Sequence, residues 1–199
     1  MSKKYILTDM GGVLLNLNWE ETVKKMLSLD YSLEKLMVEW LKIKSNVLFE
    51  TGKINFGQYA NSLIKEFNLK MSAEKVKQYY MEIIGTPKDY LYETIRNLKK
   101  NFNLAILSNT TSPHIEYIKE KYKIFSDFDY LFFSYEIKYM KPSIEAFEVA
   151  VEKMSAKKEN VLFFDDCKMN VDGAISFWLK NSFLVSSPQE IEVISNGFL

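Results

Sequence analysis

The chain has very little of several residue types, and each scarcity excludes a class of protein. It has one cysteine, Cys167, so no disulfide can form within the chain, and a reducing cytoplasm is the expected setting. It has one histidine, His114, which excludes a multi-histidine metal site. Its one arginine, Arg96, excludes arginine clusters that bind phosphate or nucleic-acid bases. Any fixed positive charge in a site must therefore come from lysine.

The chain also lacks an excess of either charge and a long apolar run. Lys+Arg and Asp+Glu both number 26, so no basic surface for nucleic acid or an anionic membrane is expected. No apolar stretch approaches the ~20 residues that span a bilayer. Ser2-Lys3-Lys4 before apolar residues faintly suggests a secretory signal, but Asp9 interrupts the run and no small-residue cleavage pattern follows. We expect a monomer or a weak dimer.

Apolar residues are abundant, and their pattern predicts an α/β fold. Hydrophobic residues make up 47% of the chain, enough for one domain with an insertion or for two small domains. Short, fully apolar runs alternate with helical patterns, and these runs are Tyr5–Leu7, Asn103–Leu107, Tyr130–Phe133, Val161–Phe164 and Phe183–Val185. Such alternation predicts a Rossmann-like parallel sheet covered by helices on both faces.

Residues 16–86 have a different pattern of apolar residues. Their apolar residues repeat at helical spacing, and we expect about four helices and no strand. Asn16 or Asn18 could cap the first helix, and Ser72 the fourth. The predicted organisation is an α/β core of residues 1–15 plus 87–199, interrupted by this helical insertion. Because the insertion follows Asp9 closely, it is well placed to be a lid.

Polar residues follow the apolar strands, and the first of these is Asp9. Ligands bind at the carboxyl ends of the strands in an open parallel sheet, where Asp9 would stand. Gly11 and Gly12 would let the backbone turn sharply and approach a ligand closely. A simple Asp-Gly turn without chemistry explains this stretch equally well, so the other strand ends must decide.

Three further segments could meet Asp9 at the same edge. Ser108-Asn109 and Lys141 each have an ordinary alternative, as a turn with a helix cap and as a surface lysine. Asp165-Asp166 is a stronger signal, because adjacent carboxylates at the rim of a core are costly unless a cation or hydrogen-bond donors offset them. Asn170 is either a helix-start cap or a site residue.

Together these residues describe phosphoryl transfer. The carboxylates of Asp9, Asp165 and Asp166 make a hard oxygen site suited to Mg²⁺. Lys141 and the Ser108 hydroxyl can hold phosphoryl oxygens, together with backbone N–H groups. An aspartate carboxylate can also attack phosphorus, which makes Asp9 a candidate nucleophile.

The sequence resembles the haloacid dehalogenase superfamily of phosphohydrolases along its whole length. Four segments look like that family's motifs in order, namely Asp9-Met10-Gly11-Gly12-Val13, Leu107-Ser108-Asn109-Thr110, Met140-Lys141-Pro142 and Phe164-Asp165-Asp166. The helical insertion looks like the C1 cap of subfamily I. The residues within these motifs, with Asn170 after the last one, look closest to those of small sugar-phosphate phosphatases of the glucose-1-phosphate type. They also resemble the phosphatase domain of soluble epoxide hydrolases.

The resemblance implies a role for each motif residue. Asp9 would be the nucleophile and a Mg²⁺ ligand, and the backbone carbonyl of Gly11 would be a second ligand. Asp165 and Asp166 would complete the metal site, one of them through water. Ser108, Asn109 and Lys141 would bind the phosphoryl group, with the Gly11 and Gly12 backbone. The implied substrate is a small phosphorylated metabolite.

One position departs from the family pattern. Most phosphatases of the superfamily carry a second aspartate two residues after the nucleophile, which protonates the leaving group, and here that residue is Gly11. A water, a cap residue or a good leaving group, such as that of an anomeric sugar phosphate, could replace it. Alternatives are a metal-independent haloacid dehalogenase, or a catalytically weak member that binds a phosphorylated ligand or a protein.

Specificity should come from the cap. Asn16, Asn18, Trp19 and Glu50 lie near its hinges or in its helices and could face the site, although capping and core packing also explain them. His114 follows Pro113 at a helix start, which favours a surface position over the alternative of a place near the site.

Overall fold

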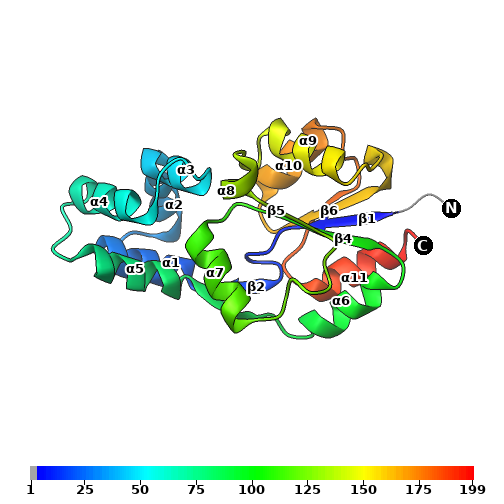
Figure 1. Ribbon diagram of the computed structural model, residues 1–199, viewed down its shortest axis with the longest axis horizontal. Coiled ribbons are helices and arrows are strands. Elements are labelled where there is room, and N and C mark those ends of the chain that lie inside the picture. Colours follow the sequence, from blue (N-terminus) through cyan, green and yellow to red (C-terminus); the bar gives the residue numbers. More distant parts are fainter. Residues whose placement is uncertain (1–3) are drawn as a thin grey trace.

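The computed structural model describes residues 4–199, except the side chain of Leu41. Two bodies lie side by side along the long axis of the molecule, an α/β body and a smaller helical body (Figure 1). The C-terminus and the first strand lie at the side of the α/β body that faces away from the helical body (Figure 1). Residues 1–3 are outside the described residues. They include Ser2 and Lys3 of the possible secretory signal and the start of the predicted core segment 1–15.

The α/β body is built on a five-stranded parallel sheet, which confirms the predicted fold class. The strand order is β5-β4-β1-β6-β7. The bounds are β1 Tyr5–Thr8, β4 Asn103–Ser108, β5 Tyr130–Phe133, β6 Val161–Asp165 and β7 Ser182–Leu184. Tyr5 pairs with Asn103 on one side and Val161 on the other, so β1 is the central strand. Its carboxyl end, where Asp9 follows, is the middle of the sheet edge.

Helices cover both faces of the sheet (Figure 1). One face carries α6 (Leu91–Lys99), α7 (Ser112–Lys121) and α11 (Pro188–Asn196), and the other α8 (Ser134–Ile137), α9 (Ile144–Lys153) and α10 (Lys168–Ser176). A short 3-10 helix, η1 (Lys158–Asn160), precedes β6. Successive side chains of a strand point to opposite faces, so Ile6 packs in the first layer and Leu7 in the second. Fully apolar strands follow from this double coverage.

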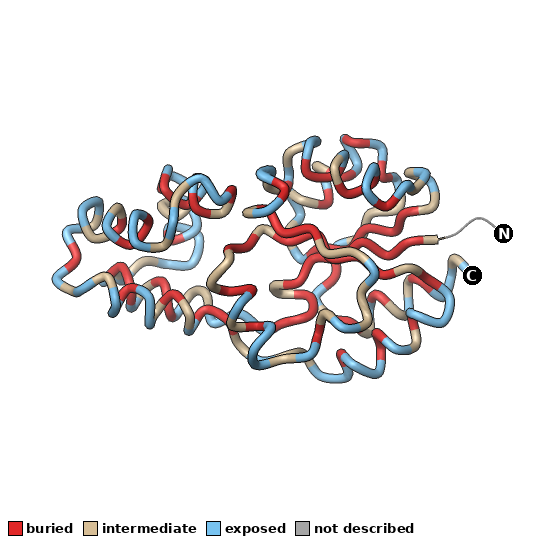
Figure 2. The backbone as a smooth tube through the Cα atoms, viewed as in Figure 1, coloured by how far each residue is buried: buried red, intermediate tan, exposed pale blue. Residues whose placement is uncertain are grey.

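The inserted helices have a hydrophobic core of their own. They are α1 (Trp19–Leu27), α2 (Leu33–Lys42), α3 (Lys44–Glu50), α4 (Phe56–Glu66) and α5 (Ala73–Glu82). Met26, Tyr59 and Leu63 are buried between them, and Figure 2 shows the buried segments on the inner sides of these helices. An antiparallel ribbon of β2 (Leu15–Leu17) and β3 (Ile84–Pro87) connects them to the sheet body. We call the five helices the cap and the ribbon its hinge.

Several element predictions were wrong. The cap region has five helices where about four were expected, and both hinge strands were missed because strands of three or four residues leave no readable alternation. Helices α8 and α11 were not predicted, and α10 begins three residues before the expected Val171. Asn18 is the N-cap of α1 but its side chain makes no capping bond, whereas the Ser72 side chain accepts one from Lys75.

Within residues 4–199, no helix combines the length and apolarity needed to cross a bilayer.

Candidate active site

Asp9 lies where the central strand ends. Its backbone N–H donates to the Phe164 carbonyl at 2.8 Å, so the sheet fixes its position on the β6 side. The turn after Asp9 brings the backbone of Gly12 against Asp166, in the loop that follows β6. Gly12 has a φ of +75°, and a Cβ there would lie 1.9 Å from Asp166 Oδ2. Only glycine permits both the conformation and this approach.

Gly12 and Asn109 have their polar groups engaged within the protein. The Gly12 N–H donates to the Leu15 carbonyl at 2.9 Å. The Asn109 side chain makes two 2.8 Å hydrogen bonds to the backbone of Lys141, accepting from its N–H and donating to its carbonyl. Asn109 therefore joins the β4 loop to the segment that carries Lys141.

Lys141 is a buried cation between two carboxylates. Its side-chain nitrogen lies 2.8 Å from Asp9 Oδ1 and 2.6 Å from Asp165 Oδ2. Only 3% of the residue is exposed. The segment reaches this point after β5, helix α8 and a turn, so Lys141 is brought to the edge by a loop rather than by a strand end. The structure thus places Lys141 against residues from two other motifs.

Asp165 and Asp166 have different surroundings. Asp165 is fully buried, and its oxygens accept hydrogen bonds from the Cys167 N–H at 2.8 Å and from Asn170 Nδ2 at 3.0 and 3.1 Å, in addition to Lys141. Asp166 is exposed. Asp165 is thus held by protein donors, while Asp166 presents its carboxylate to the loop of Gly12.

The three carboxylates form a group that fits a hard cation. Each of Asp9, Asp165 and Asp166 offers an oxygen, and these oxygens lie within 4.8 Å of one another. Oxygen-only donor sets of this kind suit Mg²⁺, which usually binds one or two carboxylates and keeps several waters. The residues present therefore fit the ion that the motifs imply.

Burial and charge oppose each other at this site. The pKa of Asp9 is raised to about 6, chiefly by burial, which Lys141 partly offsets and to which the charge of Asp165 adds. Burial also raises the pKa of Asp166, with a further contribution from Asp165. For Lys141, burial by itself lowers the pKa, but the two carboxylates outweigh it and the pKa is raised. Lys141 thus stays a cation, and additional positive charge would favour the ionised carboxylates.

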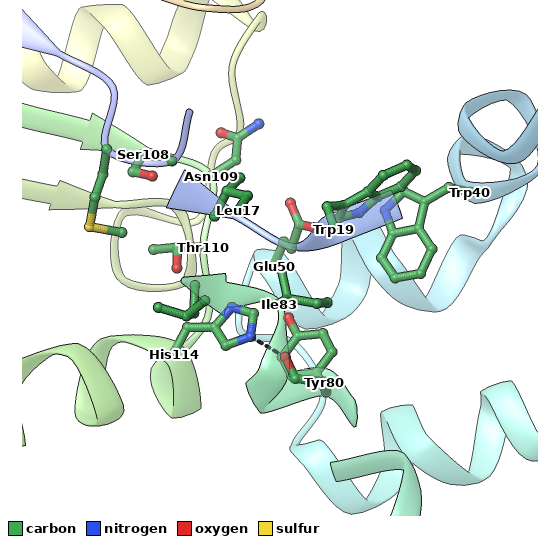
Figure 3. Close-up of a pocket in the computed structure, with 13 residues that line it drawn as sticks. Leu17, Trp19, Trp40, Glu50, Tyr80, Ile83, Ser108, Asn109, Thr110 and His114 are labelled. Carbon is green, nitrogen blue, oxygen red and sulfur yellow. Dashed lines mark hydrogen bonds between the residues drawn. The ribbon is translucent and has the colours of Figure 1, made fainter. Parts of the chain in front are cut away.

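A pocket of about 120 Å³ joins this edge to the cap (Figure 3). Its core side includes Gly11, Ser108 and Asn109. Its cap and hinge side is largely aromatic and apolar, and it includes Leu17, Trp19, Trp40, Glu50, Tyr80 and Ile83. Substrate entering between cap and core would therefore meet motif residues on one side and cap side chains on the other.

The four cap residues singled out from the sequence divide into two pairs. Trp19 and Glu50 line the pocket. Asn16 and Asn18 hold the hinge instead, since the Asn16 amide donates to Thr86 Oγ1 at 3.2 Å and the Asn18 amide to the Glu82 carbonyl at 3.2 Å. Trp40 and Tyr80 also line the pocket, and neither was predicted as a site residue, because helical periodicity does not tell which helix face meets the site.

The expected surface position of His114 is wrong. His114 is buried, its ring stacks on Tyr80 at 4.2 Å between centroids, and its Nε2 lies 2.8 Å from the Tyr80 carbonyl oxygen (Figure 3). Burial lowers the pKa of His114 to about 4, so the ring is neutral near pH 7 and Nε2–H donates to that carbonyl. His114 therefore joins α7 of the core to α5 of the cap.

The sequence of residues 3–177 matches the haloacid dehalogenase-like hydrolases. The chain belongs to this family of hydrolases. A D-ribitol-5-phosphate phosphatase of Bacteroides thetaiotaomicron is 22% identical over 178 residues, covering 84% of this chain and 85% of that protein.

Solved structures of this hydrolase family share the fold. The HAD family enzyme bt-2542 of Bacteroides thetaiotaomicron, in complex with magnesium and inorganic phosphate, has a TM-score of 0.77 at 20% identity, covering 92% of this chain and 94% of that one. The L-2-haloacid dehalogenase RSc1362 has a TM-score of 0.66 at 16% identity, covering 93% and 87%. At these identities the likeness extends to the fold alone, and the chemistry must be argued from this chain's own residues.

Proposed function

We propose that this hydrolase is a Mg²⁺-dependent phosphatase of small phosphomonoesters. The observation that carries the proposal is the buried Lys141, 2.8 Å from Asp9, beside three clustered carboxylates. A nucleophilic carboxylate next to a fixed cation suits attack on an anionic phosphoryl group. The relative named D-ribitol-5-phosphate phosphatase and the fold neighbour with bound magnesium and phosphate support the same reaction.

Each motif residue has a role in this proposal. The Asp9 carboxylate attacks phosphorus and forms an aspartyl-phosphate, which water then hydrolyses. Lys141 and the Ser108 hydroxyl bind the phosphoryl oxygens. Asp9, Asp165, Asp166 and the Gly11 carbonyl would hold Mg²⁺, and Asp165 also fixes the position of Lys141. Bound Mg²⁺ supplies positive charge that screens the repulsion between carboxylate and phosphate.

The pocket favours a small substrate with an alcohol leaving group. Its cap side carries aromatic rings and one carboxylate, and no lysine or arginine lines it among the described residues. Such a wall suits a neutral carbon chain or sugar more than a second phosphate. D-Ribitol 5-phosphate, other polyol phosphates and sugar phosphates are therefore the first substrates to test.

The proposal is tested by a phosphatase screen of the wild type beside Asp9→Asn. We expect Mg²⁺-dependent phosphate release that stops on complete chelation, and near-total loss of turnover in a folded Asp9→Asn variant. Full activity after chelation would refute the metal assignment. Turnover of a 2-haloacid in place of any phosphomonoester would favour a dehalogenase, which needs no metal. No turnover of either substrate would favour a binding role.

A further inference from the structure

We infer that Glu50, on the cap, donates a proton to the leaving group and then accepts one from the attacking water, in place of the side chain that Gly11 lacks. The inference rests on the proposed phosphatase function and extends it to a catalytic residue outside the four motifs. It implies that the natural substrate is an alkyl phosphomonoester, whose alkoxide leaving group requires a proton.

The Leu17 side chain occupies the space beside Gly11 where an acid would extend. A Cβ at Gly11 would lie 3.0 Å from Leu17 Cδ1 of the hinge strand β2, so an aspartate here would meet the Leu17 side chain. Leu17 brings no proton to the site. The acid must then come from elsewhere on the pocket wall, or the enzyme has none.

Glu50 lies on the pocket wall, where such an acid is needed. It is the last residue of α3, and it lines the pocket together with Gly11, Ser108 and Asn109 (Figure 3). Across residues 4–199 its carboxylate has no hydrogen bond or ion pair. A partly buried carboxylate without a partner is unfavourable for stability, which points to a partner that arrives with the substrate.

The other titratable groups on the pocket wall do not qualify. The Tyr80 hydroxyl lies 3.1 Å from Thr111 Oγ1, and burial raises the pKa of Tyr80 far above neutrality. His114 is neutral, with a pKa lowered to about 4 by burial, and its Nε2–H is engaged by the Tyr80 carbonyl. Burial raises the pKa of Glu50 to about 7, which suits a group that must both give and take a proton.

Glu50 gives up a proton in the first chemical step and regains one in the second. In the first, an Asp9 oxygen bonds to phosphorus while the bond from phosphorus to the leaving oxygen breaks. That oxygen keeps the electron pair, takes the Glu50 proton and departs as an alcohol. In the second, a water oxygen bonds to phosphorus while the bond to Asp9 breaks, and the water proton passes to the Glu50 carboxylate. Asp9 and Glu50 are both restored.

The test compares Glu50→Gln with wild type on two substrates in Mg²⁺. With an alkyl phosphate such as D-ribitol 5-phosphate, kcat should fall about 10²- to 10⁴-fold, the usual contribution of acid–base catalysis. With p-nitrophenyl phosphate the leaving group needs no proton, so the first turnover should survive and the second step should stall. The expected trace is a burst of one equivalent of p-nitrophenol followed by slow turnover.

A pH profile gives an independent readout. The wild-type rate on the alkyl phosphate should fall as the pH rises through about 7, because Glu50 loses the proton it must donate. Glu50→Gln should lack this limb. The groups facing Glu50 do not produce it, since the pKa values of Tyr59 and Tyr80 are raised well above neutrality and that of His114 is lowered to about 4.

Two further variants complete the design. Glu66→Gln removes an exposed cap carboxylate from α4 and should match wild type on both substrates. Glu50→Asp keeps a carboxyl group and should recover part of the alkyl phosphate rate, even if Glu50→Gln proves unstable. No recovery by Glu50→Asp, or equal losses on both substrates without a burst, would overturn the inference.

The outcomes separate this inference from the proposed function. If Glu50→Gln equals wild type on the alkyl phosphate while Asp9→Asn is inactive, Glu50 is not the acid and the phosphatase assignment stands. If the wild type hydrolyses neither phosphomonoester, both are overturned.

Discussion

Lys141 illustrates how single residues hold this site together. Its buried side-chain nitrogen lies 2.8 Å from Asp9 Oδ1 and 2.6 Å from Asp165 Oδ2, so each of the three charges is stabilised by its neighbours of opposite sign. Burying one such charge without its partners would cost several kcal/mol. The Asn109 side chain fixes the Lys141 backbone through two further hydrogen bonds. The geometry therefore exists before any ligand binds, as preorganised electrostatic stabilisation requires.

Gly12 offers a sharp test at the same scale. In Gly12→Ala the new methyl group would occupy a place 1.9 Å from Asp166 Oδ2, so Asp166 must move. We expect the Mg²⁺ concentration for half-maximal activity to rise by about 10- to 100-fold, as for other changes that disturb the orientation of a metal ligand. A Mg²⁺ titration of activity measures the change.

Gly57→Ala is the matched control for this substitution. Gly57 lies in the first turn of α4, and an added Cβ there would make only an ordinary contact, 3.4 Å from Asn55 Oδ1. It should leave the Mg²⁺ titration unchanged. A Gly12→Ala enzyme with the wild-type Mg²⁺ dependence would show that Asp166 is not a ligand.

At the scale of elements, α7 and α5 are joined by His114. Its pKa is about 4 in the folded protein and near 6.5 when unfolded, so the unfolded chain takes up the proton first as the pH falls. Wild-type stability should therefore decrease between about pH 6.5 and 4. The decrease is at most about 3–4 kcal/mol, since each of the roughly 2.5 pKa units corresponds to about 1.4 kcal/mol.

His114→Phe separates this effect from the other titrations. Phenylalanine keeps a ring against Tyr80 but loses the hydrogen bond to its carbonyl, which should lower stability at pH 7 by about 1 kcal/mol. The variant has no titrating ring at this position, so the difference should vanish as the pH falls to about 6 and reverse below that, with the variant the more stable protein at pH 4. Urea unfolding at several pH values measures both. A constant difference across this range would refute the pKa shift of His114.

Prediction of elements from the sequence succeeded where a strand is apolar throughout and failed where pairing with a distant segment decides the structure. The strands Asn103–Leu107 and Val161–Phe164 were predicted within one residue of their observed bounds, because only doubly covered strands are apolar throughout. The hinge strands were missed because they are stabilised by pairing with each other over a few residues. His114 was misplaced because its partner, Tyr80, lies on another helix 34 residues away.

At the scale of the whole molecule, two bodies with separate hydrophobic cores are connected by one short ribbon. The cap buries Met26 and Tyr59 in its core, while the sheet body buries Phe164 and Leu7 in one layer on each face of the sheet. Movement of the cap about the hinge, as a lid requires, would have to break the contact between Tyr80 and His114. The division into residues 1–15 plus 87–199 and 16–86 remains a prediction of domain boundaries.

The site lies between these two bodies, and only one of its two sides could be predicted from the sequence. The core side is predictable, because the carboxyl ends of parallel strands share one edge and the candidate residues follow those ends. The cap side is not, because whether Trp40 or Glu50 faces the pocket depends on how five helices pack. Substrate identity depends on this second side.

The proposed mechanism requires Asp9 to become covalently phosphorylated during turnover. Rapid acid quench of the enzyme with Mg²⁺ and a phosphomonoester, followed by peptide mass spectrometry, measures this directly. We expect a phosphoryl group on the peptide that contains Asp9, at the Asp9 carboxylate, and none in Asp9→Asn. An enzyme that turns over with Asp9 unmodified at every quench time, and an Asp9→Asn variant that retains the wild-type rate, would contradict it.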